Sequence, residues 1–144
     1  MNKILIINGP NLNLLHLRDK SLYGSLSLDE ISRDCQEVAK QIGVEIFFMQ
    51  SNIEGEIIEQ IHLAINNYQA IIINPAGYTH TSVAIRDALE IFKGPKIELH
   101  ISNIFSREEF RHHSFISPVV DGIISGLGSN GYTTALLAIN NMIK

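Results

Sequence analysis

The sequence predicts an α/β fold in which a five-stranded parallel sheet is doubly wound, with helices on both of its faces. Short apolar runs alternate along the chain with longer stretches in which apolar residues recur at helical spacing. The run 70–73 is apolar on both faces, which is typical of a strand buried in a parallel sheet. No repeat, linker or low-complexity tract divides the 144 residues, so we expect one domain over 1–144.

Apolar runs predict strands at 3–8, 44–49, 70–74, 96–101 and 119–125. Helical spacing predicts helices at 28–42, 54–67, 81–92 and 129–143. This order of elements favours a flavodoxin-like sheet, in which ligands bind beyond the carboxyl ends of the strands.

The first helix has the clearest boundaries. Ser27 and Glu30 stand at capping-box spacing, and Gly43 is placed to end the helix. The residues expected to face the sheet are Leu28, Ile31, Cys35, Val38 and Ile42. In the second helix the corresponding residues are Ile57, Ile58, Ile61, Leu63 and Ile65. Thr81 or Ser82 is expected to cap the third helix.

Composition and charge exclude several classes of partner. The 45% apolar and 18% charged content is typical of a soluble globular protein, and no apolar run approaches the roughly 18 residues of a membrane span. The net charge of −4, without a basic stripe, argues against nucleic acid. The single cysteine, Cys35, excludes an intrachain disulfide and is expected to be a core thiol. The first strand leaves no room for a signal peptide, so we expect a cytoplasmic protein.

Two further kinds of site have weak support. No pair of histidines or carboxylates has strong metal-ligand spacing, so no metal is expected. The glycine-rich run 126–132 lacks the spacing of a dinucleotide motif and a Walker lysine. Its glycines are expected to serve the turn into the last helix.

The longest predicted loop, residues 9–24, leaves the end of the first strand. It has about 16 residues, whereas connections in α/β domains usually have about 2–6. Loops of this length are commonly lids or binding loops. This one contains Asn11, Arg18 and Tyr23, and a solvated surface excursion is the alternative.

Polar segments follow three strand ends, at 9–13, 74–82 and 98–103, and a fourth lies at 106–114. Taken singly, each has an ordinary explanation as a turn, a helix cap or a solvated face. Because the carboxyl ends of parallel strands meet at one edge of a sheet, their joint occurrence predicts one site at that edge.

These segments resemble those of the type II 3-dehydroquinate dehydratases, or type II dehydroquinases. The matching motifs, in the order and spacing of the family, are GPNLNLL with Arg18 and Tyr23-Gly24, NPAGYTHTSVAIRDAL, ELHISN, SREEFRHHS and GLGSNGY. The likeness covers essentially the whole chain. Within the loop, His16 stands where the family usually has glycine, and Asp19 where it usually has glutamate.

The resemblance implies a single catalytic domain that removes water from 3-dehydroquinate to give 3-dehydroshikimate through an enolate. Such a reaction needs a base, an oxyanion partner, an acid and a carboxylate clamp. The lysines lie outside the strand-end motifs except for Lys20, which argues against an imine route. The resemblance implies no cofactor, and the same step serves the shikimate pathway of aromatic amino acid biosynthesis and quinate breakdown.

The resemblance implies that Tyr23 is the base and His100 the acid. An ordinary phenol is protonated at neutral pH, and a guanidinium favours its ionised form, which Arg18 can supply and Arg107 can reinforce. Glu98 and His100 are two apart on a strand, so they share one face, and the carboxylate favours the imidazolium.

The remaining roles also come from the resemblance. Asn11 would hold an ordered water against the enolate oxygen. The substrate carboxylate would bind at Ile101 and Ser102, and the ring hydroxyls would be held by Asn74, His80 and Arg111. Arg107 is also expected among the substrate-binding residues. Asp87 would reach the site of a neighbouring subunit, within a dodecamer built from trimers.

A flavodoxin-like module that binds FMN or another phosphate ligand is the alternative, and it rests on fold alone. A scaffold without activity is a third possibility, but no motif group is missing to support it.

Overall fold

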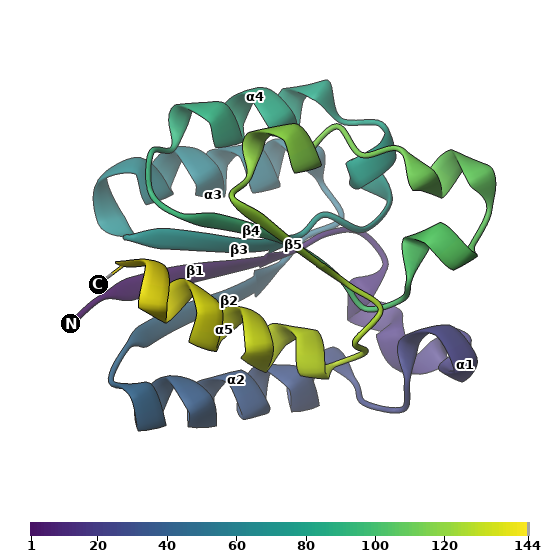
Figure 1. Ribbon diagram of the computed structural model, residues 1–144, viewed down its shortest axis with the longest axis horizontal. Coiled ribbons are helices and arrows are strands. Elements are labelled where there is room, and N and C mark those ends of the chain that lie inside the picture. The colour runs from purple at the N-terminus through teal and green to yellow at the C-terminus, as the bar shows by residue number, and fades with distance from the viewer. Residues whose placement is uncertain (144) are drawn as a thin grey trace.

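The computed structural model describes residues 1–143 and has the predicted layers, a five-stranded all-parallel sheet between two pairs of helices (Figure 1). The strands are β1 (Lys3–Asn8), β2 (Glu45–Gln50), β3 (Ala70–Asn74), β4 (Lys96–His100) and β5 (Gly122–Ser125). Their spatial order is β2-β1-β3-β4-β5. The long helices are α2 (Leu28–Ile42), α3 (Glu54–Asn67), α4 (Val83–Ile91) and α5 (Asn130–Ile143).

The three central strands, β1, β3 and β4, are almost wholly buried, as their apolar runs predict. Helices α2 and α5 cover one face of the sheet and α3 and α4 the other (Figure 1). Ile4 and Ile6 of β1 pack toward the first pair, and the alternate residues Leu5 and Ile7 pack toward the second. The order of the strands reverses direction between β1 and β3, and in such sheets the ligand crevice lies at that point.

The predicted signals at the ends of α2 and α4 are confirmed. Ser27 and Glu30 form a reciprocal capping box, and Gly43 ends α2 with φ 74°, a conformation that favours glycine. Ser82 caps α4 by accepting a hydrogen bond from the Ile85 N–H. Cys35 is fully buried, and burial first, then the nearby Asp34 charge, raises the pKa of its thiol to about 12.

Two expectations are wrong in detail. Leu63 and Ile65 of α3 are 56% and 42% exposed, because the buried stripe follows Ile57, Ile61 and Ala64. The fifth strand begins at Gly122 rather than at 119, because residues 117–119 form the short helix η5 (Ser117–Val119), which has a proline in its first turn.

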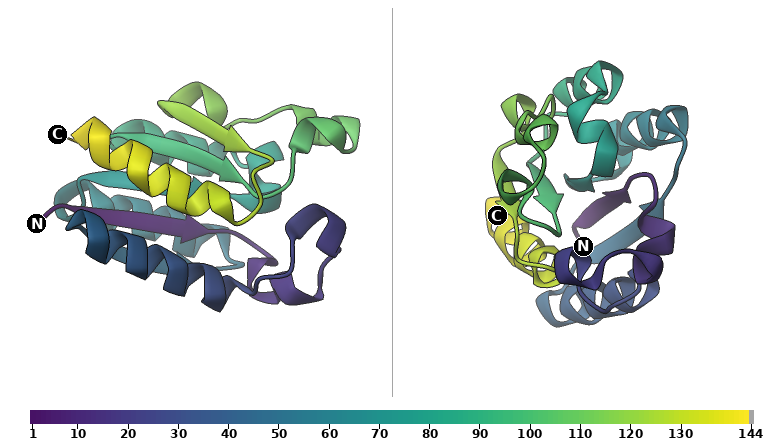
Figure 2. Two further views of the ribbon diagram at one scale, coloured as in Figure 1. Left: turned by 60° about the horizontal axis from the view of Figure 1, so that its bottom comes forward. Right: turned by 90° about the vertical axis from the view of Figure 1, so that its right-hand side faces the viewer.

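The loop 9–24 is largely helical. It contains η1 (Leu12–Leu17) and the single turn α1 (Lys20–Tyr23), and it projects beyond the carboxyl ends of the strands (Figure 2). Leu12 and Leu15 are buried in the core and anchor the first half of the loop. Asp19 begins α1 by accepting a hydrogen bond from the Ser21 N–H. The unusual His16 is exposed on η1.

The second excursion follows β4 and projects from the same end of the molecule (Figure 2). It contains η3 (Ile104–Ser106) and η4 (Glu109–His112) and returns to the body at η5. None of the helices in residues 1–143 is long and apolar enough to cross a membrane.

Candidate active site

The two excursions and the ends of β3 and β4 enclose a cavity of about 30 Å³. The structure brings most of the predicted site residues to its wall: Arg18, Tyr23, Asn74, His80, His100, Ile101, Ser102, Arg107 and Arg111. They come from four separate segments of the chain, so the predicted convergence at the carboxyl edge of the sheet is confirmed. The space has room for about one water molecule.

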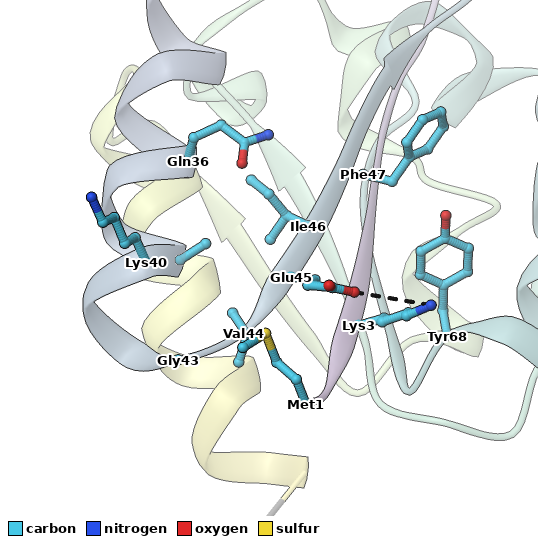
Figure 3. A pocket seen from close by; sticks show the side chains of 11 residues that line it. Met1, Lys3, Gln36, Lys40, Gly43, Val44, Glu45, Ile46, Phe47 and Tyr68 are labelled. Carbon is cyan, nitrogen blue, oxygen red and sulfur yellow. Dashed lines mark ion pairs between the residues drawn. The ribbon is translucent and has the colours of Figure 1, made fainter.

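A larger depression of about 580 Å³ lies at the opposite, amino end of the strands, between α2 and the edge strand β2 (Figure 3). The only ion pair that the structure gives there is Lys3 Nζ with Glu45 Oε2, at 3.9 Å, and both side chains are more than half exposed. The depression is open and has no convergent set of reactive groups. The chemistry therefore belongs to the smaller cavity, despite the difference in size.

Tyr23 is held between two cations. Its hydroxyl oxygen lies 2.6 Å from Arg18 Nη2 and 2.6 Å from Arg107 Nη1, and only 7% of the residue is exposed. The Arg18 guanidinium also stacks on the ring, with Cζ 4.0 Å from the centroid. Since both guanidiniums can only donate, the phenolic oxygen accepts a charge-assisted hydrogen bond from each.

Arg107 joins the loop 9–24 to the end of β4. Besides its bond to Tyr23, its Nη1 lies 3.2 Å from Ser102 Oγ, and its Nε is 3.7 Å from Glu108 Oε1. The same carboxylate oxygen accepts a 3.1 Å hydrogen bond from Arg111 Nε. The half-exposed Glu108 carboxylate therefore contacts, and helps to orient, both Arg107 and Arg111.

His100 is paired with a buried carboxylate. Its Nε2 lies 2.5 Å from Glu98 Oε2, and the two side chains are 5% and 0% exposed. The predicted shared face of this strand is thus confirmed. With Nε2 committed to Glu98, the ring nitrogen that remains for a ligand is Nδ1.

Glu98 is also bound by two serines that the sequence did not single out for this role. Ser114 Oγ donates at 3.1 Å to Oε2, and Ser117 Oγ donates at 2.5 Å to Oε1. Burial by itself would raise the pKa of Glu98, but the hydrogen bonds and charge of His100 and the two hydroxyls outweigh it and hold the pKa below its usual value. Glu98 is therefore an ionised carboxylate that stands behind His100, outside the cavity wall.

His80 is oriented by a main-chain carbonyl. Its Nδ1 lies 2.8 Å from the His113 oxygen, which can only accept, so Nδ1 carries a proton. Burial is the main reason that the pKa of His80 lies below its usual value, and the charges of His100 and Arg111 lower it further. A neutral His80 has Nε2 free as an acceptor for a ligand hydroxyl.

Asn74 is fixed by a residue far along the chain. Its Nδ2 donates at 2.9 Å to the hydroxyl of Tyr132 in α5, and that hydroxyl donates at 2.6 Å to Asn8 Oδ1. All three side chains are buried. Neither Tyr132 nor Asn8 was expected at the site. Tyr132 is separated from Asn74 by 58 positions in the sequence and from Asn8 by 124 positions, so no local pattern links them.

Besides Glu98, two of the predicted residues lie outside this cavity. Asn11 is exposed, with φ 70°, and its N–H donates at 3.0 Å to Asn52 Oδ1. Asp87 is exposed on α4 and does not line the cavity. Their expected roles need, respectively, an ordered water and a second subunit.

The described residues 1–143 contain no group of three or more histidine, cysteine, aspartate or glutamate side chains that is arranged to hold a metal ion. What the cavity offers is a set of proton donors and acceptors and three guanidiniums. It can therefore bind a small anion and move protons on it.

A parallel α/β sheet that ends in a cation-held phenol and a carboxylate-held imidazole is the arrangement of an acid–base enzyme. Comparison with known proteins makes the assignment specific. The model of the family described as dehydroquinase class II matches residues 2–140, and this chain belongs to that family.

The relatives cover the chain almost completely. It is 54% identical to the 3-dehydroquinate dehydratase of Trichodesmium erythraeum (strain IMS101) over 98% of this chain and 94% of the relative. It is 52% identical to that of Legionella pneumophila (strain Corby) over the full length of both. The crystal structure of type II dehydroquinase from Butyrivibrio crossotus DSM 2876 matches with a TM-score of 0.94 at 47% identity, over 96% of this chain and 97% of that one.

Proposed function

We propose that this chain is a single-domain 3-dehydroquinate dehydratase that converts 3-dehydroquinate to 3-dehydroshikimate through an enolate, without a cofactor. Membership of the class II dehydroquinase family and the name shared by its relatives support the reaction. The observation that carries the chemistry is Tyr23 Oη, 2.6 Å from each of two guanidiniums, on a cavity whose wall also includes His100.

The first step is removal of the proton alpha to the ketone. Tyr23, as the phenolate that Arg18 and Arg107 stabilise, accepts this proton and becomes a neutral phenol. The electron pair moves onto the ketone oxygen, and the resulting enolate is held by a water that Asn11 orients. The phenol then remains hydrogen-bonded within the same pair of arginines.

The second step is loss of the tertiary hydroxyl. His100 as the imidazolium gives a proton to the departing oxygen, and the enolate collapses to the conjugated enone. The buried Glu98 carboxylate favours the charged ring and fixes its orientation. Water leaves with the proton of His100. Tyr23 then releases its proton to solvent and His100 takes one up from solvent, which restores both groups for the next turnover.

Substrate binding falls to the remaining wall residues. The N–H groups of Ile101 and Ser102 and the Ser102 hydroxyl suit the substrate carboxylate, next to the positive charge of Arg107. Asn74, His80 and Arg111 hold the ring hydroxyls. Because a cavity of about 30 Å³ is smaller than a substituted six-membered ring, the second half of the loop, which carries Arg18 and Tyr23, would move outward to admit the substrate.

The assembly belongs to the same proposal. Asp87 is exposed in the single chain, which leaves it free to reach a neighbouring subunit's site in a trimer, with four trimers forming a dodecamer. Phe105 and Phe110, which are 62% and 63% exposed on the second excursion, are large apolar side chains that contacts between subunits would cover. The proposed enzyme is cytoplasmic and acts in the shikimate pathway or in quinate breakdown.

The direct test is an ultraviolet assay with 3-dehydroquinate, in which the product enone is followed by its absorption. Tyr23→Phe keeps the ring and its stacking on Arg18 but removes the base, so kcat should fall by about 10²–10⁴-fold. Tyr68→Phe, which removes a phenol at the opposite end of the sheet, should retain wild-type turnover. An inactive wild type, or an active Tyr23→Phe, would count against the proposal.

The alternative of an FMN-binding or phosphate-binding module rests only on the shape of the sheet, and the family match does not favour it. A visible absorption spectrum of the purified protein separates the two, because bound flavin absorbs in the visible range and the proposed lyase does not.

A further inference from the structure

A chain of buried hydrogen bonds runs from β2 through β1 and α5 to the cavity wall. It begins at Asn8, the last residue of β1, whose Nδ2 donates at 3.0 Å to the Met49 carbonyl oxygen. Because a carbonyl oxygen can only accept, this contact fixes which end of the Asn8 amide is Nδ2. Asn8 Oδ1 must therefore face the other way, toward Tyr132.

The Tyr132 hydroxyl has one hydrogen, and Asn8 determines where it goes. Asn8 Oδ1 lies 2.6 Å from the hydroxyl and can only accept, so Tyr132 donates to it. Tyr132 is fully buried in α5, and burial, more than any other influence, raises the pKa of its phenol above the ordinary range, so the hydrogen is retained. Toward its other neighbour, Tyr132 can only accept.

That other neighbour is Asn74, 2.9 Å away, and its Nδ2 must therefore face the hydroxyl. Asn74 Oδ1 then points to the N–H of Ala76, at 3.2 Å. Ala76 has φ 53°, a left-handed conformation that is unfavourable for a residue with a Cβ, and the bond to Asn74 Oδ1 supports this turn toward His80. The second Nδ2 hydrogen is the donor that Asn74 can offer to the cavity that it lines.

We infer that Tyr132, itself oriented by Asn8, is a positioning residue for Asn74: it fixes the direction of the Asn74 amide so that a donor with defined geometry meets the substrate ring. This inference rests on the proposed function, in which Asn74 holds a ring hydroxyl. Tyr132 is fully buried beneath the wall and acts only through Asn74.

The first test is Tyr132→Phe, which keeps the buried ring and removes only the hydroxyl. Asn74 then loses its acceptor, and of its two amide contacts only the 3.2 Å hydrogen bond from the Ala76 N–H remains to orient it. The contact with the substrate is made in both ground and transition states, so KM should rise about three- to tenfold while kcat changes by less than about twofold. Tyr68→Phe is the matched control, because it deletes the same group far from the site, and its KM should equal that of the wild type.

A double-mutant cycle separates positioning from general support of the fold. In an Asn74→Ala background, addition of Tyr132→Phe should leave KM unchanged, because the amide through which Tyr132 acts is gone. If the same rise in KM persists in that background, Tyr132 does not act through Asn74 and the inference is overturned. An unchanged KM for Tyr132→Phe in the wild-type background overturns it as well.

Asn8→Leu provides a second route if Tyr132→Phe does not fold. It leaves the Tyr132 hydrogen without its acceptor, so the hydroxyl can donate to Asn74 Oδ1 and reverse the amide. KM should again rise about three- to tenfold, and only in the presence of Asn74. The wild-type assay distinguishes failure of the proposed function from failure of this inference. An inactive wild type contradicts the proposed function. An active wild type whose variants keep the wild-type KM overturns only the inference about Tyr132.

Discussion

Glu98 illustrates what a single residue contributes when its partners are scattered. The spacing of Glu98 and His100 was sufficient to predict their pairing, because alternate residues of a strand share a face. The hydroxyls of Ser114 and Ser117, which complete the carboxylate's partners, were not predictable for this role. They lie 16 and 19 residues downstream, and only the return of the second excursion to the body brings them to Glu98.

The lowered pKa of Glu98 leads to a prediction for acid stability. A carboxylate whose pKa is lower in the folded state stabilises the fold above its unfolded pKa, about 4.5, and that contribution is lost as the pH falls through the native value. The urea midpoint of the wild type should therefore fall as the pH drops from about 5 toward 3. Ser117→Ala removes one hydrogen-bond donor to the carboxylate. It should lower the free energy of unfolding by about 1–3 kcal/mol at neutral pH, and by less at acid pH, where the carboxylate is protonated.

The matched control is Ser106→Ala, which removes an exposed hydroxyl that binds only the Asn103 carbonyl. It should shift the midpoint little at any pH. Equal destabilisation of the two variants at pH 7 would show that the contact of Ser117 with Glu98 adds nothing to an ordinary surface hydrogen bond.

At the scale of elements, local patterns predicted the framework and failed where partners are distant. The capping box of α2 and the apolar run of β3 were sufficient, because their physical causes lie within a few residues. The buried stripe of α3 was misjudged because several apolar residues offer more than one helical face, and packing against the sheet selects Ile57, Ile61 and Ala64. The helical content of the loop 9–24 was missed because its turns are short and rest on Leu12 and Leu15 in the core.

The start of that loop leads to a prediction for Gly9. A Cβ at Gly9 would overlap the carbonyl group of Pro75, since the two strand ends are in close contact there. Gly9→Ala should therefore destabilise the fold by about 1–3 kcal/mol in thermal or urea unfolding and disturb the base of the loop. Gly55→Ala is the matched comparison: in α3 it meets nothing within 4 Å, and it should stabilise by about 0.5–1 kcal/mol. If both variants changed the free energy of unfolding in the same direction, the close contact at Gly9 would be contradicted.

At the scale of the whole molecule, the polar segments at the carboxyl ends of the strands predicted the location of the site, and the single chain accounts for most of its wall. Asp87 is the exception, because it lies on α4 away from the cavity and its expected role requires another subunit. No pattern in one sequence specifies where a second copy binds. The assignment of Asp87 therefore depends on the family resemblance and stays a prediction.

Mixing of subunits from two variants tests whether Asp87 serves the cavity of a neighbouring subunit. Asp87→Ala and Tyr23→Phe should each lower turnover when pure. If Asp87 serves a neighbour's cavity, mixed assemblies made by unfolding and refolding the two variants together contain some sites with an intact Tyr23 and an intact neighbouring Asp87. Activity should then exceed the sum of the two separate preparations. No gain in assemblies that are shown to be mixed would assign Asp87 to its own subunit.

The position of Arg107 has a consequence for timing. Arg107 belongs to the excursion after β4, whereas Arg18 and Tyr23 both belong to the loop 9–24. Under the proposed opening, an outward movement of residues 18–24 would keep the contact of Tyr23 with Arg18 and break its contact with Arg107. In the proposed mechanism, the base would therefore have both of its cationic partners only when this part of the loop is closed over the substrate.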